Sequence, residues 1–113
     1  MKVAIVGSRS LTNIKLEGYL PSGITEIVSG GAKGIDACAR QYALANNIKL
    51  TEFLPEYNRY GKSAPLKRNL QIINYADFVM VFWDGSSHGT KYVIRQCQKL
   101  NKSVTIYRID CNR

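Results

Sequence analysis

The sequence predicts an α/β domain, a three-layer sandwich around a mainly parallel five-stranded sheet, and three observations support this. Short apolar runs alternate along the chain with segments of helical periodicity, which is the pattern of repeated strand–helix–strand crossovers. The clearest runs are apolar without interruption, as expected of parallel strands that are covered on both faces. Several runs end directly in glycine-bearing turns. Because such crossovers are right-handed, few strand orders remain, and we expect the order 3-2-1-4-5.

The expected strands are these apolar runs. Residues 3–6 form a continuous apolar run near the start of the chain, and residues 78–83 form the clearest buried strand. Proline at position 55 ends the third run, because its backbone has no N–H to donate. The five expected strands span residues 3–6, 24–28, 48–54, 78–83 and 104–109.

The segments between the runs are expected to be helices. Ile35 and Cys38 recur at helical spacing on an apolar face, and Leu66, Leu70 and Ile73 share a face of a later segment. We expect helices over residues 35–45 and 64–75, a last long helix around residues 93–100, a weak helix over residues 11–20, and a loop over residues 56–63.

Length and composition indicate one domain, residues 1–113, and an anionic partner. The chain has 113 residues, with 16 Lys and Arg against 8 Asp and Glu, for a formal net charge of +8. This balance favours nucleotides, polyphosphates or nucleic acid as partners. No run is long enough to cross a membrane, and no cysteine spacing matches a metal site. We expect a cytoplasmic protein with Cys38 and Cys97 as buried free thiols and Cys111 near a loose C-terminus.

Three turns follow expected strands and are predicted to meet at the carboxyl edge of the sheet. They cover residues 7–9, 29–36 and 84–90, and ligands of open α/β sheets bind at that edge. Glycine lets backbone N–H groups approach an anion, and a helix that begins there favours a phosphate. The candidate phosphate-binding residues are Gly7, Ser8, Arg9, Gly30, Gly31, Ala32, Lys33, Gly34, Asp36, Arg68, Asn69, Asp84, Gly85, Ser86, Ser87, Gly89 and Thr90.

The individual side chains in these turns have alternative interpretations. Asp36 can cap backbone amides or accept a ribose hydroxyl, and the hydroxyls near Thr90 can bind phosphate oxygens or cap the last helix. Arg68 can clamp a phosphate with two parallel hydrogen bonds, together with Arg9. Tyr57 is a candidate for stacking on a base. Tyr60 is a second such candidate, and Trp83 is expected in the core or at the pocket edge.

These motifs, in this order, resemble the SLOG superfamily, which joins the DNA-processing protein DprA (Smf) to the lysine-decarboxylase-like LOG enzymes. The resemblance covers nearly the whole chain and is greatest to the small YspA and cpYpsA-related branch. It implies a Rossmann-like fold that binds a nucleotide-type small molecule, such as AMP, ADP-ribose or an NAD-derived ligand. Many members form dimers, so the resemblance also implies a homodimer.

The resemblance leaves two further functions open. LOG enzymes hydrolyse nucleoside monophosphates with a glutamate, but Val93 stands at that position, so hydrolysis would need Asp36, Asp84 or Glu56 instead. DprA proteins bind single-stranded DNA, which the positive charge also allows. The missing glutamate favours ligand binding or sensing over catalysis.

Overall fold

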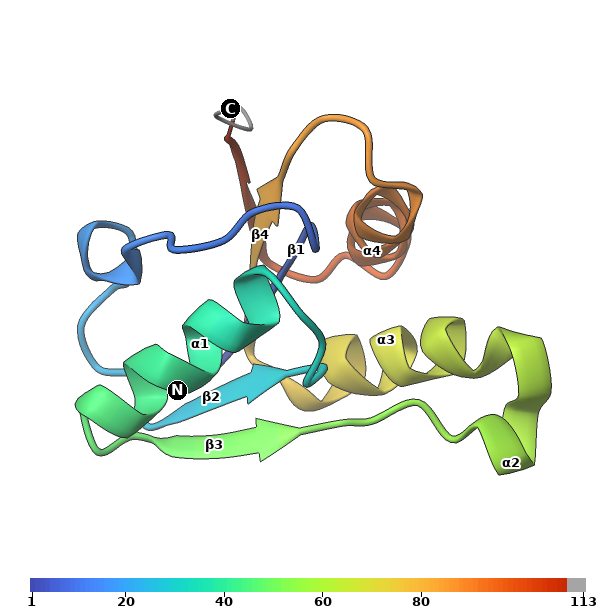
Figure 1. The fold of residues 1–113 in the computed structure, drawn as a ribbon, viewed down its shortest axis with the longest axis horizontal. Coiled ribbons are helices and arrows are strands. Elements are labelled where there is room, and N and C mark those ends of the chain that lie inside the picture. The colour runs from blue at the N-terminus through green and yellow to red at the C-terminus, as the bar shows by residue number, and fades with distance from the viewer. Residues whose placement is uncertain (110–113) are drawn as a thin grey trace.

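A five-stranded parallel sheet, covered by helices on both faces, forms the centre of the computed structural model, which describes residues 1–109 (Figure 1). The strand order β3-β2-β1-β4-β5 and the α/β fold confirm the prediction from the sequence. All four pairs of neighbouring strands are parallel. The strands are β1 (Lys2–Gly7), β2 (Glu26–Ser29), β3 (Lys49–Glu52), β4 (Phe78–Trp83) and β5 (Val104–Arg108).

Three longer helices and three short helical turns connect the strands. Their bounds are η1 (Leu16–Gly18), α1 (Ile35–Ala45), α2 (Tyr57–Tyr60), η2 (Gly61–Ser63), α3 (Ala64–Tyr75) and α4 (His88–Lys99), where η marks a 3-10 turn.

Two of these short segments correct the expectations. The prediction of a weak helix over residues 11–20 is wrong, since that segment contains only the turn η1. Asn13, with a φ of 57°, and the flexible Gly18 both disfavour a continuous helix there. The loop expected over residues 56–63 instead contains α2 and η2, because the backbone N–H groups of Arg59 and Tyr60 both donate to the carbonyl of Glu56.

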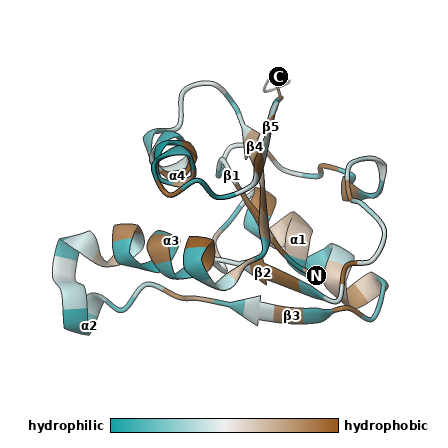
Figure 2. Cartoon of the chain, turned by 180° about the vertical axis from the view of Figure 1, so that it is seen from behind, coloured by the Kyte–Doolittle hydropathy of each residue, from teal (hydrophilic) through white to brown (hydrophobic). Residues whose placement is uncertain are grey.

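Two apolar cores lie on opposite faces of the sheet. In β1, Val3 and Ile5 pack toward the core under α1, while Ala4 and Val6 pack toward the core under α3 and α4. This burial on both faces explains the uninterrupted apolar run of the strand. Figure 2 shows the apolar residues along the central strands and on the sheet-facing sides of the helices.

Cys38, Cys97 and Trp83 lie close to their expected places. Cys38 and Cys97 are buried free thiols, as predicted, and Cys111 lies outside the described residues. Trp83 is half-buried against the core under α4, and its indole N–H donates to the carbonyl of Ser87 over 3.1 Å. No helix within residues 1–109 is long and apolar enough to cross a membrane.

The strand order reverses direction at β1, and this fixes where a ligand can enter. The chain passes from β1 to β2 and β3 on one side, then returns to β4 and β5 on the other side. The loops that follow β1 and β4 therefore run to opposite faces and leave a crevice between them at the carboxyl edge.

Candidate functional site

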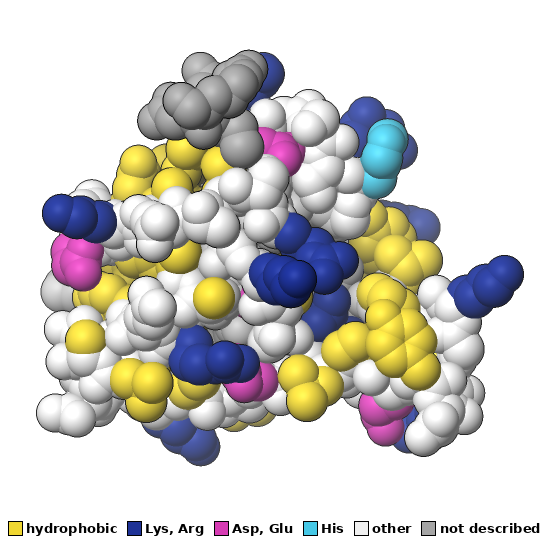
Figure 3. Space-filling view, viewed as in Figure 1, with side chains coloured by type: hydrophobic (Ala, Val, Ile, Leu, Met, Phe, Trp, Pro, Cys, Tyr) yellow, Lys and Arg dark blue, Asp and Glu magenta, His cyan; other side chains and the backbone are white. Residues whose placement is uncertain are grey.

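A cleft of about 490 Å³ lies at this carboxyl edge, lined by the loops after β1, β2 and β3, by α3 and by the start of α4. The structure therefore brings parts of all three glycine-bearing turns to one cavity. Figure 3 shows a group of Lys and Arg side chains gathered in this region, between α1 and α4. The candidate residues that line the cleft are Gly7, Arg9, Gly30, Gly31, Ala32, Asp36, Arg68, Asn69, Ser87, Gly89 and Thr90.

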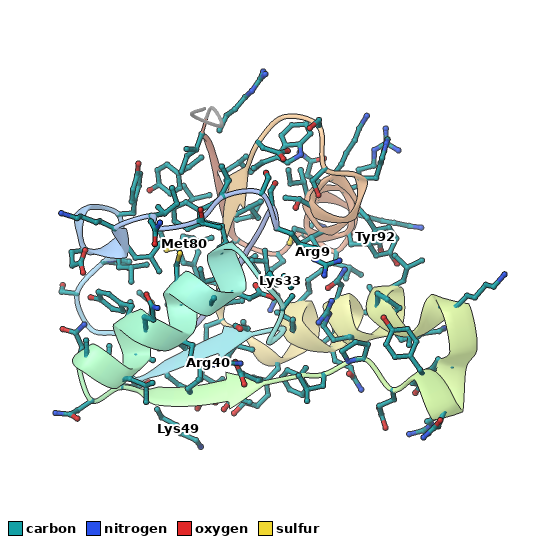
Figure 4. All side chains as sticks on the ribbon, in the orientation of Figure 1. Arg9, Lys33, Arg40, Lys49, Met80 and Tyr92 are labelled. Carbon is teal, nitrogen blue, oxygen red and sulfur yellow. The ribbon has the colours of Figure 1, made fainter. Side chains whose placement is uncertain are left out.

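Six candidates do not line the cleft, and these are Ser8, Lys33, Gly34, Asp84, Gly85 and Ser86. The Ser8 hydroxyl is buried and accepts a hydrogen bond of 3.0 Å from the backbone N–H of Asp84. Gly34 has a φ of 71°, and a Cβ there would lie 2.5 Å from the carbonyl oxygen of Ser8. Only glycine permits this approach between the first and second turns. Lys33 is exposed, and its side chain lies beside that of Arg9 in the view of Figure 4.

The carboxylate of Asp84 organises the turn before α4. Its Oδ1 accepts from the backbone N–H groups of Ser86 and Ser87 over 2.9 and 2.8 Å, and its Oδ2 accepts from the Ser10 hydroxyl over 2.6 Å. These hydrogen bonds hold the pKa of Asp84 well below its ordinary value, and the one from the Ser10 hydroxyl contributes most. Ser87 in turn caps α4 by accepting from the N–H of Thr90. The capping alternative is therefore present for Ser87, while phosphate binding by these hydroxyls stays a prediction.

The guanidinium of Arg68 is fixed at the floor of the cleft. Its Nη1 donates to the carbonyl of Gly30 over 2.7 Å and its Nε donates to Oδ1 of Asn69 over 2.8 Å. A longer contact of 3.5 Å joins Nη1 to the carbonyl of Phe53, and no described residue accepts from Nη2. A Cβ on Gly30 would lie 2.5 Å from Nη1, so glycine is required for this approach. The side chain is thus oriented before any ligand arrives, with one nitrogen still available.

Asp36 is the only carboxylate among the described residues that line the cleft. Its side chain is buried, with 7% exposed, and Oδ2 accepts from the backbone N–H of Ala32 over 3.1 Å. Burial raises the pKa of Asp36, while the Ala32 hydrogen bond and the charge of Arg68 oppose that rise. The capping role predicted for this residue is therefore present in the structure.

The cleft carries excess positive charge. The ion pairs within residues 1–109 are Arg40–Glu52 and Lys49–Glu26, so neither Arg9 nor Arg68 is paired with a carboxylate there. Burial lowers the pKa of Arg68, and the nearby charge of Arg9 lowers it further. Two guanidinium groups close enough to repel each other form a favourable site for an anion.

The apolar end of the cleft was not predicted from the sequence. Leu54, Pro55, Pro65 and Leu66 line it, beside the Tyr57 that was predicted to stack on a base. Leu66 had been expected on a buried helix face, but 41% of it is exposed. The signal was available, because residues 54 and 55 follow β3 directly and so lie at the same carboxyl edge as the glycine turns.

Three further residues constrain the chemistry of the cleft. Val93 lines it with only 3% of its surface exposed, and it adds no carboxylate. Tyr60, the second candidate for stacking, does not line the cleft, and neither does Trp83. No group of three or more metal-ligating side chains occurs within the described part of the chain. The arrangement offers hydrogen-bond donors and positive charge at one end and flat apolar surface at the other.

Comparison with known proteins gives one match. The family model described as DNA recombination-mediator protein A matches residues 1–57, which include β1, β2, α1, β3 and the first two glycine-bearing turns. The search of curated proteins and the search of solved structures found no match.

Proposed function

The chain belongs to the family of DNA recombination-mediator protein A, and on that premise we propose that its cleft binds a nucleotide-type ligand through a phosphate group. The observation that carries this proposal is the convergence of Arg9, Arg68 and the start of α4 on one cleft that has a single, buried carboxylate. Each of these three groups favours an anion, and a phosphate can accept hydrogen bonds from all of them.

The amino end of α4 is open to a ligand. A Cβ built on Gly89 would meet no atom within 4 Å, so a phosphate oxygen can approach the backbone of the first helical turn. α4 runs from His88 to Lys99 without an acidic residue in its first turn, so the partial positive charge of the helix end faces no carboxylate from the helix itself. The free Nη2 of Arg68 and the exposed side chain of Arg9 supply the remaining charge.

Titration calorimetry and thermal shift with AMP, ADP-ribose, NAD and cyclic nucleotides test this proposal. We expect at least one of these ligands to bind, and Arg68→Ala and Arg9→Ala to weaken that binding. Arg95→Ala is the matched control, because Arg95 is an exposed residue of α4 that does not line the cleft. A folded protein that binds none of these ligands, or that binds them equally well without Arg68, would contradict the proposal.

Single-stranded DNA is a second candidate ligand, favoured by the family match and by the formal net charge of +8. Binding to a DNA backbone releases counterions, so its affinity falls steeply as the salt concentration rises. Titrating a labelled oligonucleotide at several salt concentrations, with AMP as competitor, separates the two candidates. Displacement by AMP places the DNA backbone in the same cleft, whereas salt-insensitive or absent binding excludes this candidate.

The hydrolase alternative now depends on Asp36. Asp84 has both carboxylate oxygens engaged in the turn before α4, and neither Asp84 nor Glu56 lines the cleft. Chromatography of nucleoside monophosphates after incubation with the protein tests whether a free base is released. Release that survives Asp36→Asn would exclude Asp36 as the reacting carboxylate, and no release would leave binding as the function.

A further inference from the structure

The apolar end of the cleft exposes side chains that proteins usually bury. Leu54 and Tyr57 are each 60% exposed and Leu66 is 41% exposed. They are among the few large apolar side chains that the described residues leave exposed, and all three line the same cavity. Exposed apolar surface concentrated at one cavity indicates a ligand surface.

Tyr57 has no partner for its ring or its hydroxyl within residues 1–109. No hydrogen bond, stacked ring or overlying cation involves its side chain in that part of the chain. Tyr60, three residues later, differs, because Arg59 and Lys67 lie 5.2 and 5.9 Å from the centre of its ring. The Tyr57 ring is thus available for a ligand, while the Tyr60 ring is used within the protein.

The position of Tyr57 in the cleft is fixed by the turn around it. Tyr57 is the first residue of α2, whose turn is closed by two hydrogen bonds of 3.0 Å to the carbonyl of Glu56. Pro55 precedes this turn and Pro65 follows it, and both line the cleft with restricted backbones. Tyr57 and Arg68 line the same cavity, so a ligand held by the guanidinium can also reach the ring.

We propose that Tyr57 stacks on the nucleobase of the nucleotide, with Leu54 and Leu66 against the edges of the base. This inference rests on the proposed function, since a phosphate held by Arg9 and Arg68 directs the rest of the ligand toward the apolar end. The side chains of Leu54, Pro55, Pro65 and Leu66 have no polar atoms to read the edge of a base. The contact therefore recognises the face of the ring and tolerates any base.

Binding of AMP, CMP and ribose 5-phosphate to the Tyr57→Ala and Tyr57→Phe variants tests this inference. Tyr57→Ala removes the ring and is expected to weaken the binding of AMP and of CMP by about 5- to 150-fold, the range for loss of one base–aromatic stack. It leaves ribose 5-phosphate unchanged, because that probe has no base. Tyr57→Phe keeps the ring and retains the wild-type affinity. Tyr60→Ala is the matched control on the same short helix, and it also retains wild-type binding.

The outcomes separate this inference from the proposed function. If ribose 5-phosphate binds and Tyr57→Ala leaves the affinity for AMP unchanged, the stacking role is overturned while phosphate binding stands. If neither AMP nor ribose 5-phosphate binds to the wild-type protein, both are overturned. Equal losses in Tyr57→Ala and Tyr60→Ala would show that α2 serves only as a structural support. AMP binding that is much tighter than CMP binding would contradict tolerance of any base.

Discussion

The guanidinium of Arg68 on α3 donates a 2.7 Å hydrogen bond to the carbonyl oxygen of Gly30, in the turn between β2 and α1. Gly30 lies within the segment that matches the family model, and Arg68 lies outside it. A Cβ on Gly30 would also come within 3.0 Å of Oδ2 of Asp36, so the positive and the negative group flank the same backbone position. The site is therefore assembled by the fold from segments far apart in the chain.

Gly30→Ala is expected to displace Arg68 and weaken nucleotide binding. The new methyl group would lie 2.5 Å from Nη1, and this guanidinium is held by two short hydrogen bonds that resist movement. We expect AMP affinity to fall at least about 10-fold. The free energy of unfolding should fall by about 1 kcal/mol, the net value of one hydrogen bond, because only the ends of flexible side chains have to move. Titration calorimetry and urea denaturation measure the two effects.

Gly18→Ala is the control for this substitution. A Cβ at Gly18 would meet nothing within 4 Å, and its φ is not positive. The control should retain both AMP affinity and stability. Wild-type affinity in Gly30→Ala would contradict the role assigned to the contact between Gly30 and Arg68.

Arg68→Lys keeps the positive charge but removes the planar guanidinium. One ammonium group cannot reproduce the geometry in which Nε reaches Asn69 and Nη1 reaches Gly30 while Nη2 stays available. We expect AMP affinity to fall about 10-fold and stability to fall by about 1 kcal/mol, the net value of one hydrogen bond. Arg9→Lys serves as the comparison, because Arg9 is exposed and makes no hydrogen bond to a described residue. Similar effects in the two variants would mean that charge, not geometry, determines binding.

The sheet could be predicted from the sequence because strands that are buried on both faces appear as continuous apolar runs. Residues 78–83 and 64–75 match the observed strand β4 and helix α3 at both ends. Right-handed crossovers left only a few possible strand orders, and the one expected among them is the observed one. The prediction of a helix over residues 11–20 failed for a physical reason. Leu11 and Leu16 are both buried, but they pack as separate residues and not as one face of a helix.

The candidate site could be predicted only in part, because neighbouring residues in one turn have different tertiary partners. Asp84 and Ser87 both fall in the third turn, yet the Ser10 hydroxyl engages Asp84 while Ser87 lines the cleft. No local pattern reveals a hydrogen bond across 74 residues. The apolar end of the cleft was missed because Leu66 sits at a spacing that fits a buried helix face as well.

Asp36→Asn is expected to stabilise the protein near neutral pH relative to the wild type. Burial raises the pKa of Asp36 above its ordinary 3.8, so the ionised form lowers the stability of the fold. This cost is present above the raised pKa and disappears as the pH falls below 3.8. Asparagine carries no charge, and its Oδ1 can still accept from the N–H of Ala32. The stability gain should therefore shrink as the pH is lowered.

Urea denaturation of both proteins at neutral pH and at lower pH values measures this difference. Acid weakens the wild-type protein through other carboxylates, so the difference between variant and wild type is the quantity to follow. A gain that stays constant with pH would show that ionised Asp36 is not the source. A loss of stability at neutral pH would show that the charge of Asp36 favours the fold, through Arg68.

Asp84→Asn and Asp77→Asn form a matched pair at opposite ends of β4. Hydrogen bonds lower the pKa of each carboxyl: those from the Ser10 hydroxyl and the turn amides act on Asp84, and that from the backbone N–H of Lys2 acts on Asp77. Each carboxylate thus contributes stability above 3.8 that is lost as the pH falls through its lowered pKa. Both variants should show a smaller loss of stability on acidification than the wild type.

Only the Asp84 variant should also affect the cleft. Asparagine can accept from the amides of Ser86 and Ser87, and its Nδ2 can only donate to the Ser10 hydroxyl. All three hydrogen bonds therefore lose the negative charge of the carboxylate, and the turn before α4 is weakened. The expected loss of stability at neutral pH is about 1 kcal/mol. AMP affinity should fall, because Ser87, Gly89 and Thr90 line the cleft from this turn and the first turn of α4, while Asp77→Asn should retain wild-type affinity. Equal affinities in the two variants would show that the Asp84 turn does not position the ligand.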